Sequence, residues 1–170
     1  MADEPNVFLS LGSNLGDRFR NLRRALTELN SHPHVTIQSI SPVYRTEPMY
    51  NPRQADFFNC VVHLRTDLKP DELLRACTKI EEEMGRRRTG RKNSARPIDL
   101  DIVFFGNRTM NTRKLNIPHP GYAERKFVLV PLENIAPGFV CPDTGMTVKQ
   151  TLRRCADESW IEVVREAETA

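Results

Sequence analysis

The sequence has no hydrophobic run long enough to cross a membrane. None of its apolar stretches approaches the roughly 20 residues that a bilayer-spanning helix needs, and the mean hydropathy is −0.50. The first six residues, Met-Ala-Asp-Glu-Pro-Asn, are polar and acidic, unlike a secretory signal. These absences predict a soluble cytoplasmic protein with no membrane partner.

The sequence has no cysteine spacing that suits metal or redox chemistry. The four cysteines are Cys60, Cys77, Cys141 and Cys155, and no two of them form a C-x-x-C pair. Neither a zinc site nor a redox disulfide is therefore predicted. Cys60 and Cys77 fall on apolar positions of an expected strand and an expected helix, so we expect reduced thiols that serve as packing residues.

The chain also lacks internal repeats, low-complexity tracts and any linker that would mark a second domain. We expect one domain over residues 1–170, with an ordered core at about 6–160, and a monomer. The net charge is only +3, yet six of the eleven residues from Arg86 to Arg96 are basic. Such a local cluster suits a small anionic ligand better than nucleic acid.

Two aspartates follow this basic cluster in a predicted strand. Residues 98–105 are mainly β-branched and aromatic and end before a Gly-Asn turn, which indicates a buried strand. Because side chains alternate along a strand, Asp99 and Asp101 share one face, and Ile98, Leu100 and Ile102 share the other. Carboxylates roughly 7 Å apart at their Cα atoms repel each other unless cations lie between them.

The residues alone leave two explanations of the aspartate pair open. The pair can be the wet face of a half-exposed sheet. Alternatively it binds Mg²⁺, which prefers oxygen ligands and takes others from water and phosphate. The neighbouring arginines supply planar, permanently charged groups for phosphate oxygens. This adjacency favours a magnesium–polyphosphate site and phosphoryl-type transfer from a nucleotide.

The order of elements predicts a fold of the α+β class. Apolar periodicities indicate β-α-β-β-α-β in the first hundred residues, which is the ferredoxin-like arrangement of an antiparallel sheet with helices on one face. Asp17 is expected to cap the first helix, Pro70 to open the second and Gly85 to end it. The expected strands are 7–11, 35–44, 56–65 and 98–105. Additional C-terminal elements are a strand at 115–120, a helix or extended segment at 127–132 and a short helix at 148–155.

Three shorter motifs have two interpretations each. Gly12-Ser-Asn-Leu-Gly16 lacks the Gly-Lys-Ser/Thr ending of a Walker loop, so it is a tight turn or lines a site. Phe57 and Asn59 share a strand face. They either hold a flat heterocycle, by ring stacking and by hydrogen bonds to its donor and acceptor edge, or belong to the core. His119, between two prolines, is expected to be exposed, as a phosphate ligand or as a turn residue.

In order along the chain, these segments resemble the 6-hydroxymethyl-7,8-dihydropterin pyrophosphokinase family of folate synthesis. The resemblance covers most of the chain, and Arg96-Pro-Ile-Asp-Leu-Asp-Ile102 with Pro118-His-Pro120 downstream is highly specific. The other matching segments are Leu11-Gly-Ser-Asn-Leu-Gly16, Val43-Tyr-Arg-Thr-Glu-Pro48, Asp56-Phe-Phe-Asn59, Glu81, Gly85-Arg-Arg-Arg88, Arg125-Lys-Phe-Val-Leu129 and Pro131-Leu-Glu-Asn-Ile-Ala-Pro137.

The resemblance implies a reaction and the residues that perform it. ATP would donate its β,γ-pyrophosphate to the hydroxymethyl oxygen of the dihydropterin, releasing AMP, and the product would pass to dihydropteroate synthase. Asp99 and Asp101 would hold two Mg²⁺ ions, and Arg86 and Arg96 would stabilise charge. The implied nucleotide site comprises Thr78, Glu81, Arg88, Lys92, Ile102, Lys114, Leu115, Asn116, His119 and Arg125. The implied pterin pocket comprises Thr46, Met49, Phe57, Asn59 and Phe127, with the two phenylalanines stacked on opposite faces of the ring.

The sequence departs from the family pattern in the basic loop. Asn93 stands where many members carry tryptophan, and Ala95 where proline is frequent. We expect the two long loops, 47–54 and 85–97, to close over bound nucleotide. The alternatives are a ferredoxin-like RNA-binding module, for which residues 86–96 lack the required aromatic residues, and a kinase that transfers only the γ-phosphate and releases ADP.

Overall fold

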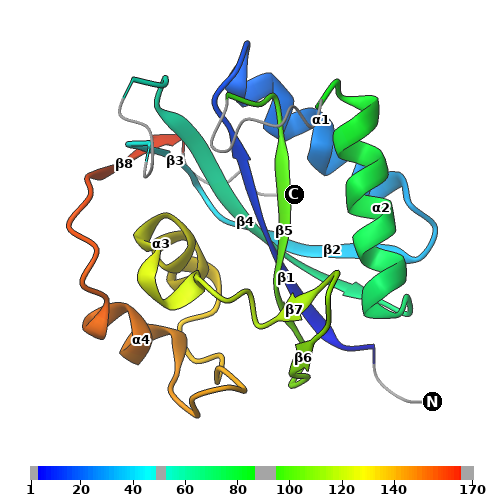
Figure 1. The fold of residues 1–170 in the computed structure, drawn as a ribbon, viewed down its shortest axis with the longest axis vertical. Coiled ribbons are helices and arrows are strands. Elements are labelled where there is room, and N and C mark those ends of the chain that lie inside the picture. The colour runs from blue at the N-terminus through cyan, green and yellow to red at the C-terminus, as the bar shows by residue number, and fades with distance from the viewer. Residues whose placement is uncertain (1–3, 49–52, 87–94, 166–170) are drawn as a thin grey trace.

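The computed structural model describes residues 4–48, 53–86 and 95–165. Within them, a six-stranded antiparallel sheet lies at the centre and helices cover both faces (Figure 1). The α+β class is thus as predicted. The elements are β1 (Asn6–Ser13), α1 (Arg18–Ser31), β2 (Val35–Ile40), β3 (Val43–Thr46), β4 (Phe57–Thr66), α2 (Pro70–Glu83), β5 (Asp99–Phe105), β6 (Met110–Asn111), β7 (Asn116–Ile117), a 3-10 turn η1 (Tyr122–Glu124), α3 (Lys126–Ile135), α4 (Val148–Arg154) and β8 (Ile161–Arg165).

The strand order is β5-β1-β4-β3-β8, and β2 also pairs with β4. The prediction of one strand over residues 35–44 is wrong, because Ser41 and Pro42 separate β2 from β3. Pro42 has no N–H for a ladder. Ser41 instead donates its N–H to Val61 O and accepts the Val61 N–H at its Oγ, both at 2.9 Å. The two short strands therefore pair with successive parts of β4.

α1 and α2 pack on one face of the sheet. Asp17 caps α1 as predicted, since its carboxylate accepts the Arg20 N–H at 3.0 Å, and Pro70 is the first residue of α2. The apolar stripes of the two helices meet alternate residues of β1, β4 and β5. This core includes Leu9, Leu11, Leu22, Ala25, Leu29, Cys60, Val62, Leu73, Cys77, Ile80, Leu100 and Ile102.

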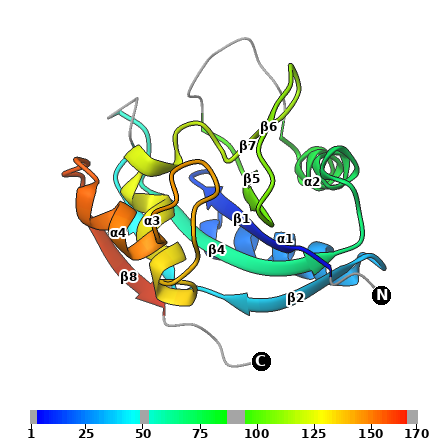
Figure 2. The ribbon, with the colours of Figure 1, turned by 90° about the horizontal axis from the view of Figure 1, so that it is seen from below.

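α3 and α4 pack on the opposite face (Figure 2). The sequence analysis predicted helices on one face of the sheet from the first hundred residues. That arrangement does not describe the whole fold, because helices cover both faces. The segment at 127–132 is helical, within α3. The second core includes Phe8, Val61, Phe104, Tyr122, Val128, Leu129, Leu132, Cys141 and Val148.

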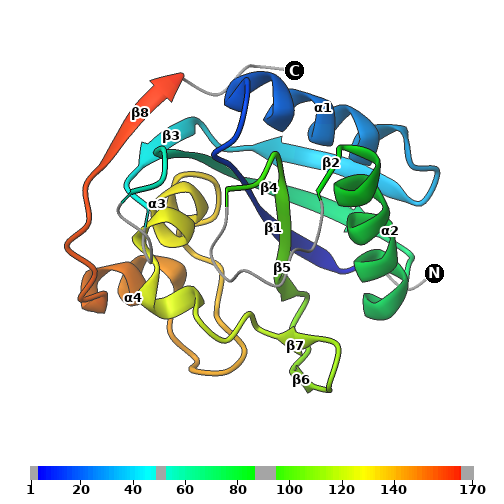
Figure 3. The same ribbon diagram turned by 45° about the horizontal axis from the view of Figure 1, so that its top comes forward.

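The C-terminal part returns to the sheet, which the sequence analysis did not predict. β8 pairs with β3 at the edge opposite β5 (Figure 3). The segment before it is held to α3, because Asp157 Oδ2 accepts the Lys126 N–H at 2.9 Å. The expected strand at 115–120 is shorter, being only β7 in a hairpin with β6. No helix within the described ranges is both long and apolar enough to span a membrane.

Candidate active site

The aspartate pair lies on the edge strand β5, on the sheet face away from α1 and α2. Asp99 is opposite Gly12 of β1, and Asp101 is opposite Ser10. Leu100 and Ile102 point the other way, into the core beneath α1 and α2. Both carboxylates therefore occupy one face, as the alternation along the strand predicts.

Glu81, near the end of α2, binds the start of β5. It is 5% exposed, and its Oε2 accepts the Leu100 N–H at 2.9 Å and Arg86 Nη1 at 2.6 Å. The same Nη1 donates to Asp99 Oδ1 at 2.7 Å. Arg86 thus neutralises two carboxylates at once, directly after Gly85, whose φ of +91° turns the chain away from α2.

Asp101 is half-buried and lies close to two other carboxylates. Burial and the charges of Asp99 and Glu81 raise the pKa of Asp101 to about 7, and Arg125 and Arg86 offset this only in part. The described residues contain no group of three or more His, Cys, Asp or Glu side chains that could hold a metal. Two carboxylates are few for an all-protein site, so this donor set fits Mg²⁺ when phosphate and water oxygens complete the coordination shell.

Arg96 reaches Asp99 from the other end of the basic loop. Its Nε lies 3.4 Å from Asp99 Oδ2. Asn14 holds the Arg96 backbone, because Asn14 Oδ1 accepts the Arg96 N–H at 2.8 Å and the Asn14 N–H donates to Arg96 O at 3.2 Å. Asn14 Nδ2 also donates to Gln54 Oε1 at 2.8 Å. Asn14 therefore connects the segments before α1, β4 and β5.

An amide and two aromatic rings lie beside this charged region. Asn59 Nδ2 donates to Thr46 Oγ1 at 2.6 Å, and both residues are buried. Phe57 of β4 and Phe127 of α3 are half-buried. Each ring has a guanidinium carbon 5.8 Å from its centre, from Arg96 over Phe57 and from Arg125 over Phe127. The arrangement offers a flat, electron-rich surface with a fixed amide next to it.

The positions implied for a nucleotide differ in how accessible they are. A hollow of about 210 Å³ is lined by Thr78, Glu81, Glu82 and Arg86. Lys114 and Asn116 are exposed on the β6–β7 hairpin, whereas Leu115 is buried.

Ile102 can meet a nucleotide only through its backbone, because its side chain lies in the core. The Leu100 N–H points at Glu81, away from β1. Backbone groups two residues apart point to the same side of an antiparallel strand. The N–H and C=O of Ile102 therefore also point away from β1, to the outer edge of β5.

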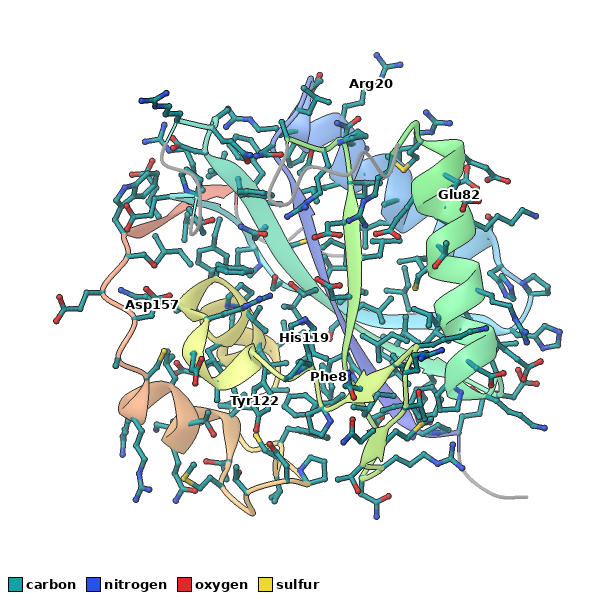
Figure 4. All side chains as sticks on the ribbon, viewed as in Figure 1. Phe8, Arg20, Glu82, His119, Tyr122 and Asp157 are labelled. Atoms are coloured by element: carbon teal, nitrogen blue, oxygen red, sulfur yellow. The ribbon has the colours of Figure 1, made fainter. Side chains whose placement is uncertain are left out.

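His119 lies between α3 and β5 (Figure 4) and is half-buried, not exposed as predicted. The backbone N–H of His119 donates to the Val103 backbone carbonyl oxygen at 3.0 Å. Its Nδ1 accepts the Gly121 N–H at 3.1 Å, so the neutral ring carries its proton on Nε2. Burial and the charge of Arg125 lower the pKa of His119, and Asp99 opposes that shift. His119 therefore presents a neutral N–H donor beside the carboxylates.

The family model described as 7,8-dihydro-6-hydroxymethylpterin-pyrophosphokinase (HPPK) matches residues 8–137. The chain belongs to the HPPK family. It is 43% identical over 129 residues to the 2-amino-4-hydroxy-6-hydroxymethyldihydropteridine pyrophosphokinase of Bacillus subtilis, which covers 76% of this chain and 77% of that protein.

Several HPPK relatives are much longer than this chain. The folic acid synthesis protein FOL1 of Dictyostelium discoideum is 42% identical over 144 residues, which are 85% of this chain and 22% of that protein. The chain thus spans about a fifth of such relatives. The Plasmodium falciparum HPPK-DHPS wild type with pteroate has a TM-score of 0.72 at 15% identity, over 91% of this chain and 45% of that one. At this identity the likeness concerns the fold alone.

Of the residues implied for the HPPK site, Asp99, Asp101 and Asn59 share the sheet face away from α1 and α2, whereas Thr78 and Glu81 lie on α2. Met49, Arg88, Lys92 and Asn93 lie outside the described residues. The sequence analysis did not identify Asn14 or Gln54. Asn14 falls within the Gly12–Gly16 motif, and that motif was the only sequence signal that this turn lines a site. No sequence pattern predicted a role for Gln54.

Proposed function

We propose that this chain transfers the β,γ-pyrophosphate of ATP to the hydroxymethyl oxygen of 6-hydroxymethyl-7,8-dihydropterin. The observation that carries the proposal is that two groups of residues share one sheet face. They are a charged half, with Asp99 and Asp101 of β5, and an aromatic–amide half, with Phe57 and Asn59 of β4. Asp99 of β5, Gly12 of β1 and Asn59 of β4 are paired in register. Because neighbouring strands are about 4.8 Å apart, about 10 Å separate the two halves, a span that two adjoining substrates bridge.

Asp99 and Asp101 would hold two Mg²⁺ ions together with phosphate oxygens. Such ions would supply charge neutralisation of the triphosphate and would favour in-line attack on its β-phosphorus. The arrangement of the two carboxylates supports this role, because Asp99 and Asp101 lie on the same sheet face, opposite Gly12 and Ser10 of β1. In the transfer, the hydroxymethyl oxygen forms a bond to the β-phosphorus and loses its proton to solvent, the bond from that phosphorus to the α-phosphate oxygen breaks, and AMP leaves.

Arg86 and Arg96 would stabilise the charge that develops on the phosphoryl oxygens. Both guanidinium groups contact Asp99 in the structure. Their planar donors can turn to phosphate oxygens once cations occupy the carboxylates. Arg88 and Lys92 are proposed to position the phosphates from the same loop.

Thr46, Met49, Phe57, Asn59 and Phe127 would form the pterin pocket. Phe57 and Phe127 would stack on the ring. Asn59 offers a second Nδ2 hydrogen and its oxygen to the donor and acceptor atoms of a pterin edge. The hydrogen bond from Asn59 to buried Thr46 supports this role, because it fixes which way the amide points.

The nucleotide would bind between α2, the edge of β5 and the β6–β7 hairpin. Thr78 and Glu81 line the hollow there, and Ile102 would contribute its backbone. His119, through Nε2–H, and Arg125 would contact phosphates. The proposed nucleotide contacts on the hairpin are Lys114, Leu115 and Asn116.

Further proposals concern the fold and the surroundings of the protein. We interpret the core as ferredoxin-like, since the order β5-β1-β4 with β2 and β3 beyond it supports that topology. We propose a cytoplasmic monomer in which the described residues belong to a single domain. The matched HPPK-DHPS structures support the proposal that the product passes to a dihydropteroate synthase.

Product analysis tests the proposal. The protein is incubated with ATP, Mg²⁺ and the hydroxymethyl dihydropterin, and nucleotides are separated by ion-exchange chromatography. Equal amounts of AMP and dihydropterin diphosphate are expected, both lost on chelation with EDTA. Formation of ADP would indicate γ-phosphate transfer instead. No comparison supports the RNA-binding alternative, and pterin-independent RNA binding without ATP consumption would favour it.

A further inference from the structure

Gly12 forms the floor between the charged half and the aromatic–amide half of the site. It pairs with Asp99 on one side and with Asn59 on the other. A Cβ atom at residue 12 would point to this same face, since its nearest neighbours are side-chain atoms of Asn59 and Phe57. The strand position directly between the two halves therefore carries no side chain.

Backbone conformation does not require glycine at this position. Gly12 lies within the buried strand β1, and its φ is outside the left-handed range that Gly16 adopts at +72°. A glycine in a strand interior weakens the strand unless something must approach its backbone closely. Glycine is therefore needed at this position because a side chain has no room there.

The approaching group is the amide of Asn59. A Cβ at residue 12 would lie 2.7 Å from Asn59 Oδ1 and 3.5 Å from Phe57 Cδ1. The first distance is too short for a carbon and an oxygen in van der Waals contact. Asn59 is 4% exposed and its Nδ2 is held by Thr46 at 2.6 Å, so the amide has its oxygen over Gly12 and its nitrogen toward Thr46.

We infer that Gly12 is a positioning residue that fixes the orientation of the Asn59 amide and so determines which heterocycle edge the site accepts. A methyl group at residue 12 displaces Oδ1 and turns the amide away from Thr46. This inference rests on the proposed function, in which Asn59 binds the pterin.

Substitution Gly12→Ala tests the inference by binding. The dissociation constant of the dihydropterin is measured by calorimetry with Mg²⁺ and a non-hydrolysable ATP analogue present. We expect it to rise at least tenfold, whereas the dissociation constant of the Mg²⁺–nucleotide analogue alone changes less than about threefold. Gly138→Ala is the matched control, because a Cβ there meets no atom within 4 Å, and it should bind both ligands as the wild type does. Unchanged pterin binding by Gly12→Ala would overturn the inference.

A double-variant cycle separates positioning from a general structural effect. In the Asn59→Ala background, the added Gly12→Ala change should weaken pterin binding no further, because the group that it displaces is gone. Additive losses would contradict the inference. If Gly12→Ala alone does not fold, the double variant should regain cooperative unfolding, and failure of both variants would contradict the role assigned to Asn59.

A measurement without ligand keeps the two proposals distinct. The side-chain amide signals of Asn59 in a ¹⁵N–¹H correlation spectrum should move in Gly12→Ala and stay in place in Gly138→Ala. If the wild-type protein binds no pterin, the proposed function is wrong, yet these signals still report whether Gly12 orients Asn59. Unmoved signals in Gly12→Ala would show that it does not.

Discussion

Asn14 and Arg96 hold each other by two hydrogen bonds, although 82 residues separate them in the sequence. Asn14 Oδ1 accepts the Arg96 N–H at 2.8 Å, and the Asn14 N–H donates to Arg96 O at 3.2 Å. The basic loop is thereby fixed at its C-terminal end, directly before the aspartate pair. The place of the Arg96 guanidinium thus depends on the turn between β1 and α1.

Asn14→Ala should lower turnover more than it lowers substrate affinity. Loss of the Oδ1 acceptor lets the Arg96 backbone shift, and misplacement of a catalytic group by about 1 Å can cost on the order of 10²-fold. Steady-state kinetics with AMP as the measured product checks this. Asn30→Ala, at an exposed position of α1, is the control and should turn over normally. A kcat for Asn14→Ala equal to that of the control would contradict this coupling.

Glu81→Ala should destabilise the protein more than Glu81→Gln. The alanine variant leaves the buried Leu100 N–H without its acceptor, at a cost of about 1–3 kcal/mol. Glutamine keeps an acceptor oxygen there, so its cost should be smaller. Urea unfolding of both variants measures the difference, with Glu83→Ala at an exposed site of α2 as control. Equal free energies of unfolding for Glu81→Ala and Glu81→Gln would refute the assigned role of Glu81 at the β5 edge.

His63 should make the protein less stable in mild acid. Burial, and secondarily the charge of Arg65, lower the pKa of His63 below its usual value. Its ring stacks on Phe8 at 4.8 Å between centroids, and its Nε2 lies 2.9 Å from Asn6 Oδ1. The folded protein binds a proton there more weakly than the unfolded chain, so stability is lost as pH falls through about 6.5.

The pH dependence of His63→Phe isolates this contribution. Phenylalanine keeps a ring against Phe8 and cannot titrate. Between pH 7.5 and pH 5, the free energy of unfolding should fall further in the wild type than in the variant. An equal fall in both proteins would exclude His63 as a source.

Cys155 should be the most reactive thiol of the native protein. Cys60, Cys77 and Cys141 are buried, and Cys155 is partly exposed. Burial raises the pKa of Cys60 to about 12, which suppresses its thiolate. Titration with a thiol-reactive disulfide should modify Cys155 first and all four cysteines only in guanidinium chloride. Rapid modification of Cys60 under native conditions would contradict the described core.

Local patterns in the sequence were sufficient for some features and not for others. The shared face of Asp99 and Asp101 follows from alternation alone, because β5 is a regular strand around them. Pro42, which has no backbone N–H, marks the break between β2 and β3 in the sequence itself. Short apolar runs do not distinguish a helix from a strand. For this reason the sequence did not determine whether the segment at 127–132, now part of α3, is helical or extended.

Contacts between distant segments explain the remaining differences. The roles of Asn14 and of Glu81 at the β5 edge depend on hydrogen bonds to residues that no periodicity brings together. In the sequence, Gly12 resembles part of a turn. In the structure, glycine is needed there because the Asn59 amide of the neighbouring strand β4 lies over it. β8 pairs with β3, and although residues 161–164 include β-branched side chains, Val163 and Val164 are both exposed, so the segment has no buried apolar face to predict a strand.

The most direct test of the central claim is to locate divalent cations in crystals of the protein grown with Mn²⁺, a non-hydrolysable ATP analogue and the dihydropterin. Anomalous scattering from manganese should appear beside the carboxylates of Asp99 and Asp101, between them and the nucleotide phosphates. Bound nucleotide with no manganese next to either aspartate would contradict the account.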